Sequence, residues 1–195
     1  MQKSYEYLII GAGIMGLSVA KSLKAKQPAS QILILDKEAD CAAHASGRNS
    51  GVLHTGFYYT ADSLKAKFTV EGSRQMKEYC RKNNIAMNEC GKLVVAQNEV
   101  ELKQLYELER RGKRNGSNVR IISESEASQL EPNIKTFQKA LYSPDTASVD
   151  PKEVCFNLKK DLQNLNVHFS FNCQYLRHQN NTLITTQGDF TAAKI

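Results

Sequence analysis

Short apolar runs and amphipathic stretches alternate along this chain. Residues 5–10 (Y-E-Y-L-I-I) and 31–36 (Q-I-L-I-L-D) each predict a buried strand, and residues 14–27 between them predict a helix. A strand, a helix and a second strand in this order form a βαβ unit, in which the two strands must be parallel. The nearly continuous Ile and Leu of both strands indicates a sheet that is covered on both faces.

The pattern changes after the second strand. Residues 37–62 show no sustained period and are rich in Gly, Ser, His and Asn, so we expect an ordered, functional loop there. A helical period returns from Ser63. Its apolar positions share one face, at Leu64, Phe68, Met76 and Cys80.

The second half of the chain predicts three more helices and several strands. The helices begin at Asn98, Ser123 and the D-P-K-E sequence of residues 150–153, with Asn98 and Asp150 as capping residues. Strands are expected at residues 91–96, 119–122, 167–171, 173–178 and 182–187, and the Asn180-Asn181 pair makes a hairpin turn. Residues 190–195 resemble a strand that is just starting, so we expect the chain to be a fragment of a longer protein.

The composition is that of an ordinary globular protein, with 41% hydrophobic and 24% charged residues in a chain of 195. No apolar run approaches the ~20 residues of a transmembrane segment, and no signal peptide is evident, so we expect a cytoplasmic protein. The net charge is +6, but the basic residues are scattered along the chain. This distribution argues against nucleic-acid binding and leaves peripheral contact with the inner membrane open. The cysteines and histidines show no metal-ligand spacing, so we expect reduced thiols and no metal.

A glycine-rich motif joins the first strand to the first helix. Gly11, Gly13 and Gly16 form G-A-G-I-M-G, in which the first permits a tight turn and the second permits close approach of a pyrophosphate. The third lets the helix pack against the strand, and the helix amino terminus attracts phosphate. Asp36, at the end of the second strand, can accept hydrogen bonds from ribose hydroxyls. The motif predicts a dinucleotide site, to which we also assign Lys37, but does not separate NAD from FAD.

The loop after the second strand separates the two cofactors. Residues 44–56 read H-A-S-G-R-N-S-G-V-L-H-T-G, followed by Y-Y at 58–59 and S-L-K-A at 63–66. This segment resembles the D-amino-acid-oxidase-like flavoproteins, and within them the L-2-hydroxyglutarate oxidases and dehydrogenases. The likeness continues through residues 90–96, 131–134 and 146–150. Two departures are Asp36, where these proteins usually have Glu, and Arg48, where close relatives often have His; the second adds positive charge near the cofactor or substrate.

The resemblance implies that this loop runs along an FAD pyrophosphate towards the flavin ring. The physical properties of the loop agree, because its glycines let backbone N–H groups face anionic oxygens and its short polar side chains do not crowd a planar ring. The cofactor-binding residues expected in this loop are Ser46, Gly47, Asn49, Ser50, Gly51 and Val52.

His54 is the best catalytic candidate. Oxidation of an alcohol needs a base for the hydroxyl proton, and His suits that role near neutral pH, although a His that only hydrogen-bonds the flavin or the loop is an equal alternative. Tyr58 and Tyr59 are expected on the substrate side. Lys65 is more simply a solvated charge, and His44 a structural or flavin-edge residue.

We therefore expect an α/β protein: a Rossmann-type FAD domain of the glutathione-reductase-like arrangement with part of an inserted α+β substrate domain. The FAD domain is expected at residues 1–84 and 140–195, and the substrate domain at 85–139. The resemblance implies oxidation of L-2-hydroxyglutarate to 2-oxoglutarate, with a quinone or another acceptor reoxidising FAD. Two alternatives are an amino-acid, sarcosine or glycerol-3-phosphate enzyme of the same family, and an inactive nucleotide-binding fragment. We expect little or no turnover from these 195 residues alone.

Overall fold

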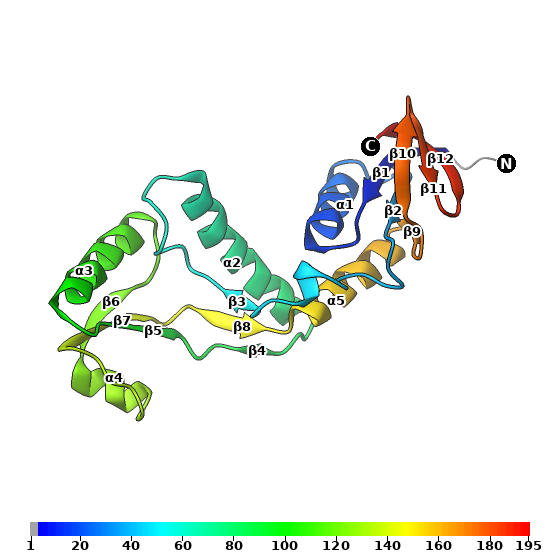
Figure 1. Cartoon of the computed structure of the whole chain (residues 1–195). Helices are drawn as coiled ribbons and strands as arrows, with labels where there is room; N and C mark the ends of the chain where they lie inside the picture. Colours follow the sequence, from blue (N-terminus) through cyan, green and yellow to red (C-terminus); the bar gives the residue numbers. More distant parts are fainter. Residues whose placement is uncertain (1–3) are drawn as a thin grey trace. The chain divides into compact units, whose positions relative to one another are not determined.

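The structure, a computed structural model, describes residues 4–195, so residues 1–3 of the predicted first domain lie outside it. The chain divides into two compact units (Figure 1). The first contains residues 4–50 and 151–195, and the second contains residues 51–150. Within residues 4–195 no helix is both long and apolar enough to cross a membrane.

The first unit is built on one mixed sheet. Its strand order is β10-β11-β12-β1-β2-β9, in which β12, β1, β2 and β9 run parallel and β10, β11 and β12 are antiparallel. The strands are β1 (Ser4–Ile10), β2 (Ile32–Leu35), β9 (His168–Ser170), β10 (Tyr175–Gln179), β11 (Thr182–Thr185) and β12 (Gly188–Lys194). The parallel pairing of β1 with β2 confirms the predicted βαβ unit, and β12 confirms a strand near residues 190–195.

Two helices, α1 (Ile14–Lys26) and α5 (Pro151–Asn164), pack against each other in this unit (Figure 1). All four residues of β2 are buried, which agrees with a sheet covered on both faces. One face forms a cluster of Tyr5, Leu8, Leu33 and Leu35 with Leu183 and Ala192. On α5 the predicted apolar stripe is buried at Val154, Leu158 and Leu162.

The second unit contains two small antiparallel sheets and three helices. One sheet is β3-β8-β4 and the other is β5-β7-β6. Their bounds are β3 (Val52–Leu53), β4 (Met87–Asn88), β5 (Lys92–Val95), β6 (Arg120–Ser123), β7 (Lys139–Ser143) and β8 (Ala147–Val149). The helices are α2 (Leu64–Lys82), α3 (Glu99–Arg114) and α4 (Glu124–Leu130).

The β5-β7-β6 sheet has a different helix packed on each face. Alternate residues of a strand point to opposite faces, so Val94 and Leu141 lie on one face and Leu93 and Ala140 on the other. Val94 and Leu141 pack in a cluster with Leu102 and Leu105 of α3 and with Phe57 and Tyr58. Leu93 and Ala140 pack with Ile122 and with Ala127 of α4. The segment that carries Phe57 therefore belongs to the α3 side of this sheet.

Three of the predicted helix starts are confirmed by their caps. The Ser63 side chain accepts a hydrogen bond from Ala66 N, and the Asn98 side chain accepts one from Glu101 N. Ser123 forms a reciprocal capping box with Glu126. Each cap satisfies one backbone donor of the first turn, which has no partner within the helix.

The apolar face predicted for α2 is only partly covered. Cys80 is buried, but Leu64 and Phe68 are 69% and 66% exposed. The helical period was correct, because it depends only on spacing. The first turns of α2 stay exposed, because no other apolar side chains among the described residues of the second unit cover them.

The compact units differ from the predicted domain boundaries at residues 84 and 140. The second unit begins at Gly51 and ends at Asp150. The reason is strand pairing and close packing: β3 pairs with β8, and a Cβ built on Gly56 would lie 2.6 Å from Val70 Cγ2 of α2. These contacts join the end of the loop and α2 to the second unit. The assignment of cofactor and substrate roles to the two units remains a prediction.

Candidate functional site

The glycine-rich turn between β1 and α1 has the geometry that its motif requires. Gly11 has a φ of +106°, a conformation that L side chains rarely adopt. A Cβ on Gly16 would lie 2.0 Å from the carbonyl oxygen of Gly11, so only glycine permits this approach of α1 to the end of β1. The amino terminus of α1 therefore starts immediately beyond β1, where its free N–H groups and positive dipole end favour an anion.

Asp36 lies at the end of β2 and is bonded to the backbone on both sides. Its Oδ2 accepts a hydrogen bond from Ala12 N at 2.7 Å, and its Oδ1 accepts one from Glu38 N at 3.0 Å. The carboxylate thus ties the glycine-rich turn to the turn after β2. A carboxylate has about four acceptor positions, so lone pairs remain for ribose hydroxyls. The ribose contact stays a prediction.

The loop after β2 is ordered by its own side chains. The Ser46 hydroxyl accepts a hydrogen bond from Ile14 N at 2.9 Å, which caps α1 from a distance in sequence, and Gly13 leaves room for this hydroxyl. Asn49 Nδ2 donates to Ala45 O and Ser46 O, on the short helix η1 (Ala45–Gly47). Both groups were predicted to face the cofactor; Ser46 holds the loop against α1, and Asn49 holds the turn of η1. Ser50 ends this part of the loop and is exposed.

A hollow of about 310 Å³ lies at the carboxyl ends of β1 and β2. It brings together four residues singled out from the sequence, namely Gly11, Asp36, Lys37 and His44, in the place where open α/β sheets bind ligands. Its other lining residues are Ile10, Leu35, Cys173, Gln174 and Tyr175.

Residues 173–175 were missed by sequence reasoning. They follow β9, which lies beside β2 in the sheet, so their place at the hollow depends on strand order rather than on a motif. Cys173 N donates to Asp36 O at 2.9 Å, which fixes this segment to the end of β2. Their place at the hollow could have been predicted only from the pairing of a short strand at residues 167–171 with β2.

The groups that line the hollow are of the kind that the glycine-rich motif predicts for a dinucleotide site. The hollow offers backbone at a glycine that tolerates close approach, a carboxylate for ribose hydroxyls and the flat apolar surface of Tyr175. At its rim Glu38 accepts from His44 Nε2 at 2.7 Å and from Lys37 at 2.9 Å. Hydrogen bonds from Lys37 and then from His44 lower the pKa of the Glu38 carboxyl below its usual value.

The remaining predicted residues lie in the second unit. Gly51 O accepts from Val149 N at 3.0 Å, and Val52 pairs with Ser148 of β8. His54 follows β3, and its ring meets the Tyr58 ring edge-on with 6.3 Å between centroids. Tyr59 lies under the Lys65 ammonium, 4.5 Å from its ring centroid. The structure therefore gathers His54 and the two tyrosines in one segment of the second unit.

His54 is partly buried, and its environment favours the neutral ring. Burial lowers the pKa of His54 first, and the positive charge of Lys92 lowers it further. A neutral imidazole has one nitrogen that can accept a proton. The arrangement can therefore do general-base chemistry near neutral pH.

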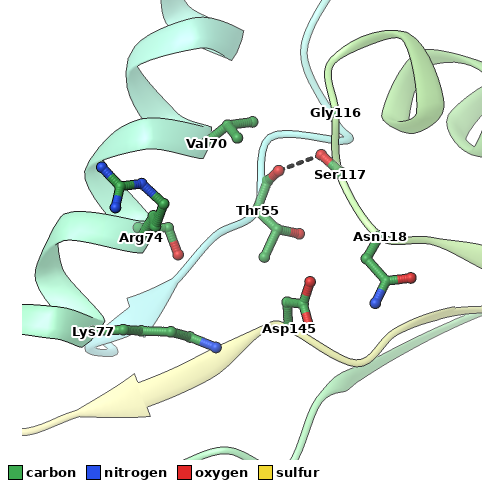
Figure 2. A pocket seen from close by; sticks show the side chains of 9 residues that line it. Thr55, Val70, Arg74, Lys77, Gly116, Ser117, Asn118 and Asp145 are labelled. Atoms are coloured by element: carbon green, nitrogen blue, oxygen red, sulfur yellow. Dashed lines mark hydrogen bonds between the residues drawn. The ribbon is translucent and has the colours of Figure 1, made fainter. Parts of the chain in front are cut away.

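Three residues that sequence reasoning missed hold the His54 segment in place. Figure 2 shows the Ser117 hydroxyl donating to Thr55 O, next to His54. The Thr55 hydroxyl bonds Ser143 Oγ at 3.0 Å, and both residues are buried. Asn115 Nδ2 donates to Gly56 O and to Tyr59 O, each at 3.1 Å. No local pattern marks these residues, because each is far from residue 54 in the sequence.

A second hollow, of about 270 Å³, lies beside Thr55 in this unit. Figure 2 shows Arg74 and Lys77 of α2 on one side of it and Asn118 and Asp145 on the other. Arg74 pairs with Glu71 at 2.6 Å, and Lys77 lies 3.6 Å from Glu89. These cations are already paired with carboxylates, so this hollow is a poorer anion site than the turn before α1.

Comparison with known families and proteins identifies what this chain is similar to. A family model described as FAD dependent oxidoreductase (DAO) matches residues 6–195. The chain is 40% identical over 161 residues to the mitochondrial L-2-hydroxyglutarate dehydrogenase of Bos taurus, covering 82% of this chain and 35% of that protein. It is 34% identical over 196 residues to the L-2-hydroxyglutarate dehydrogenase of Escherichia coli, covering 98% of this chain and 46% of that protein. The chain thus spans less than half the length of these curated relatives.

Solved structures have the same fold. The L-alpha-glycerophosphate oxidase of Mycoplasma pneumoniae, solved with FAD bound, is 25% identical with a TM-score of 0.84, over 98% of this chain and 53% of that one. Glycine oxidase from Geobacillus kaustophilus is 19% identical with a TM-score of 0.87, over 99% of this chain and 54% of that one. At that identity the second likeness shows the fold alone.

Proposed function

The chain belongs to the family of FAD dependent oxidoreductases, and from this premise we propose that it forms part of an enzyme that oxidises L-2-hydroxyglutarate to 2-oxoglutarate. The observation that carries the substrate is the similarity, over most of this chain, to proteins named L-2-hydroxyglutarate dehydrogenase. The reaction removes a hydride from the carbon that bears the hydroxyl and a proton from the hydroxyl oxygen. The enzyme must therefore provide a cofactor site and a base.

The first unit is proposed to hold FAD. The amino terminus of α1 would bind the pyrophosphate, and Asp36 would accept hydrogen bonds from the ribose. Lys37 lines the same hollow and pairs with Glu38, and Ser46 keeps the following loop against α1. When bound, FAD supplies the acceptor for the hydride.

The second unit is proposed to supply the base. The neutral His54 ring would accept the substrate hydroxyl proton, and its lowered pKa keeps that ring unprotonated under more acidic conditions than for an exposed histidine. Tyr58 orients the ring by its edge-on contact, and Ser117 fixes the backbone of the adjacent Thr55. Tyr58 and Tyr59 would line the substrate side. A quinone or another acceptor would then reoxidise the cofactor, with peripheral membrane contact in the quinone case.

FAD retention is the first test. The purified chain is mixed with FAD and passed through a desalting column, and we expect a visible flavin band to stay with the protein. Absence of flavin from both the chain and the complete protein that contains it would contradict the cofactor assignment. The variant Asp36→Ala is the matched test of the hollow, because it removes the carboxylate that binds Ala12 N and Glu38 N.

Anaerobic reduction of the bound flavin tests the substrate. With the complete protein, we expect L-2-hydroxyglutarate to bleach the flavin band, and the D enantiomer, glycine and sarcosine to leave it unchanged. The variant His54→Gln should keep the flavin and slow bleaching by roughly 10²–10⁴-fold, the usual contribution of a general base. Bleaching by an amine but not by the hydroxy acid would contradict the proposal.

One alternative substrate has a specific observation in its favour. The likeness to a glycerophosphate oxidase structure extends over 98% of this chain. Glycerol 3-phosphate is therefore the competitor to include in the same assay. It carries a phosphate where L-2-hydroxyglutarate carries carboxylates, so the two substrates also differ in the cationic partner that they need.

A further inference from the structure

Lys92 is placed beside the His54 segment by the register of the β5-β7-β6 sheet. It pairs across the sheet with Ser143, whose hydroxyl bonds the hydroxyl of Thr55 at 3.0 Å. It also shares a strand face with Val94, which packs in the cluster that contains Phe57 and Tyr58. Backbone pairing and the apolar cluster therefore both direct the Lys92 side chain towards residues 54–58.

The Lys92 ammonium stands over an aromatic ring that contacts His54. Its Nζ lies 4.8 Å from the Tyr58 ring centroid, and the same ring meets His54 edge-on. The Tyr58 ring itself is braced by Phe57, with 4.2 Å between centroids. The Lys92 ammonium, the Tyr58 phenol and the candidate base His54 are thus held together beside the buried ring of Phe57.

Within residues 4–195 no carboxylate pairs with Lys92, which is half-buried. In this cation–π contact the Tyr58 ring offers no oxygen or nitrogen acceptor to the three N–H donors of the ammonium. A partly desolvated cation with free donors favours an anionic partner. Such a cation next to a base is arranged to bind an acid whose oxidisable hydroxyl lies close to a carboxylate.

We propose that Lys92 is a substrate-binding residue, which receives a carboxylate of the hydroxy acid and places the neighbouring hydroxyl at His54. This inference rests on the proposed function, because it needs an anionic substrate at the His54 site. It adds a residue that the motif of the His54 loop does not contain. Among the described residues, Lys92 is the cation that contacts Tyr58, so it also explains how this segment would hold an acid.

Binding at Lys92 also changes the base. Burial and then the charge of Lys92 lower the pKa of His54, and Lys92 is the charged group of the described residues that acts on it. A carboxylate on the ammonium offsets that charge, so substrate binding raises the pKa of His54 again. The base therefore becomes stronger when the substrate arrives.

The matched control is Lys65. Its ammonium also lies over a tyrosine, 4.5 Å from the Tyr59 ring centroid, but it is exposed and does not contribute to the pKa shift of His54. Lys65→Met and Lys92→Met remove the same charge from neighbouring tyrosines. A general effect of net charge would appear in both variants, and a specific effect only in the second.

The test is an NMR pH titration of the histidine ring signals of the chain, with His54 assigned by the His54→Gln variant. We expect the midpoint of His54 to rise in Lys92→Met, to stay unchanged in Lys65→Met and to stay low in Lys92→Arg. Adding sodium L-2-hydroxyglutarate, against sodium chloride at equal ionic strength, should raise the midpoint in the wild-type chain and not in Lys92→Met. Binding to Lys92→Met should be roughly tenfold or more weaker, as for loss of a charge-assisted hydrogen bond.

Two outcomes would overturn the role of Lys92. One is a His54 midpoint that is the same in Lys92→Met and in the wild-type chain. The other is a wild-type midpoint that the hydroxy acid moves no further than sodium chloride does. These differ from failure of the proposed function, which would appear as flavin that L-2-hydroxyglutarate does not reduce while the His54–Lys92 coupling persists.

Discussion

The glycine-rich turn of the first unit and the His54 segment of the second are held by hydrogen bonds of different range. Asp36 binds Ala12 N and Ser46 binds Ile14 N, across 24 and 32 residues of sequence. Thr55 binds Ser117 and Ser143, across 62 and 88 residues. The turn is assembled within one βαβ unit and the loop that follows it. The His54 segment is assembled only when strands that are distant in the sequence have paired. Changes far from residue 54 should therefore disturb it.

The largest expected effect is at the turn. Gly16→Ala places a Cβ 2.0 Å from the carbonyl oxygen of Gly11, and backbone cannot move aside cheaply. We expect a loss of about 3 kcal/mol or more in the free energy of unfolding, the upper range for overpacking, together with loss of flavin retention. Urea denaturation measures the first and the desalting column the second.

The control for this substitution is Gly72→Ala on α2, where a Cβ would meet nothing within 4 Å. Alanine is a better helix former than glycine, so stability should stay equal or rise by up to about 1 kcal/mol. Equal losses in the two variants would show that close packing of α1 on β1 is not what makes Gly16 necessary.

Asp36→Asn should have the next largest effect. The amide has one acceptor oxygen where the carboxylate has two, so one of the bonds from Ala12 N and Glu38 N is lost. Hydrogen bonds to charged groups contribute about 1.5–3 kcal/mol, and we expect a loss of that order by urea denaturation. Asp145→Asn, at an exposed carboxylate of the second unit, should change stability by less than about 0.5 kcal/mol. A similar loss in both would argue against a special role for Asp36.

Ser117→Ala tests the long-range support of the His54 segment. It leaves the carbonyl of Thr55, a buried residue, without its donor, which should cost about 1–3 kcal/mol. The His54 and Tyr58 ring signals should shift in NMR spectra, while flavin retention by the first unit should be preserved. Ser73→Ala, in the hollow beside Thr55, is the matched control and should move neither ring. Unchanged ring signals in Ser117→Ala would mean that Thr55 is held without it.

The smallest expected effect is the pH dependence contributed by His54. Its pKa is lowered in the folded chain, so the unfolded chain takes up the proton first as the pH falls through the ordinary value of about 6.5. Stability from this group is therefore complete above that pH and decreases below it. The free energy of unfolding should fall less steeply with acid in His54→Gln than in the wild-type chain. Identical slopes would contradict a lowered pKa.

Local spacing was enough to predict the first unit around its turn. The period of residues 14–27, the apolar runs on either side and the three glycines are all properties of neighbouring residues, and the structure has the expected strand, helix and strand. Helix starts at Ser63, Asn98 and Ser123 were equally predictable, because a cap acts within its own first turn. The strands β7 and β8 were missed, since K-A-L-Y-S and A-S-V are too short to show a period.

The sequence by itself thus determined the βαβ unit, the turn that suits a pyrophosphate and the segment that contains His54. Tertiary structure decided what surrounds them. Strand order brings Gln174 and Tyr175 to the hollow, and strand register brings Lys92 to the Tyr58 ring. The physical reason is that a motif encodes backbone geometry within a few residues, whereas the neighbours of a side chain depend on which distant strands pair and on which face each residue falls.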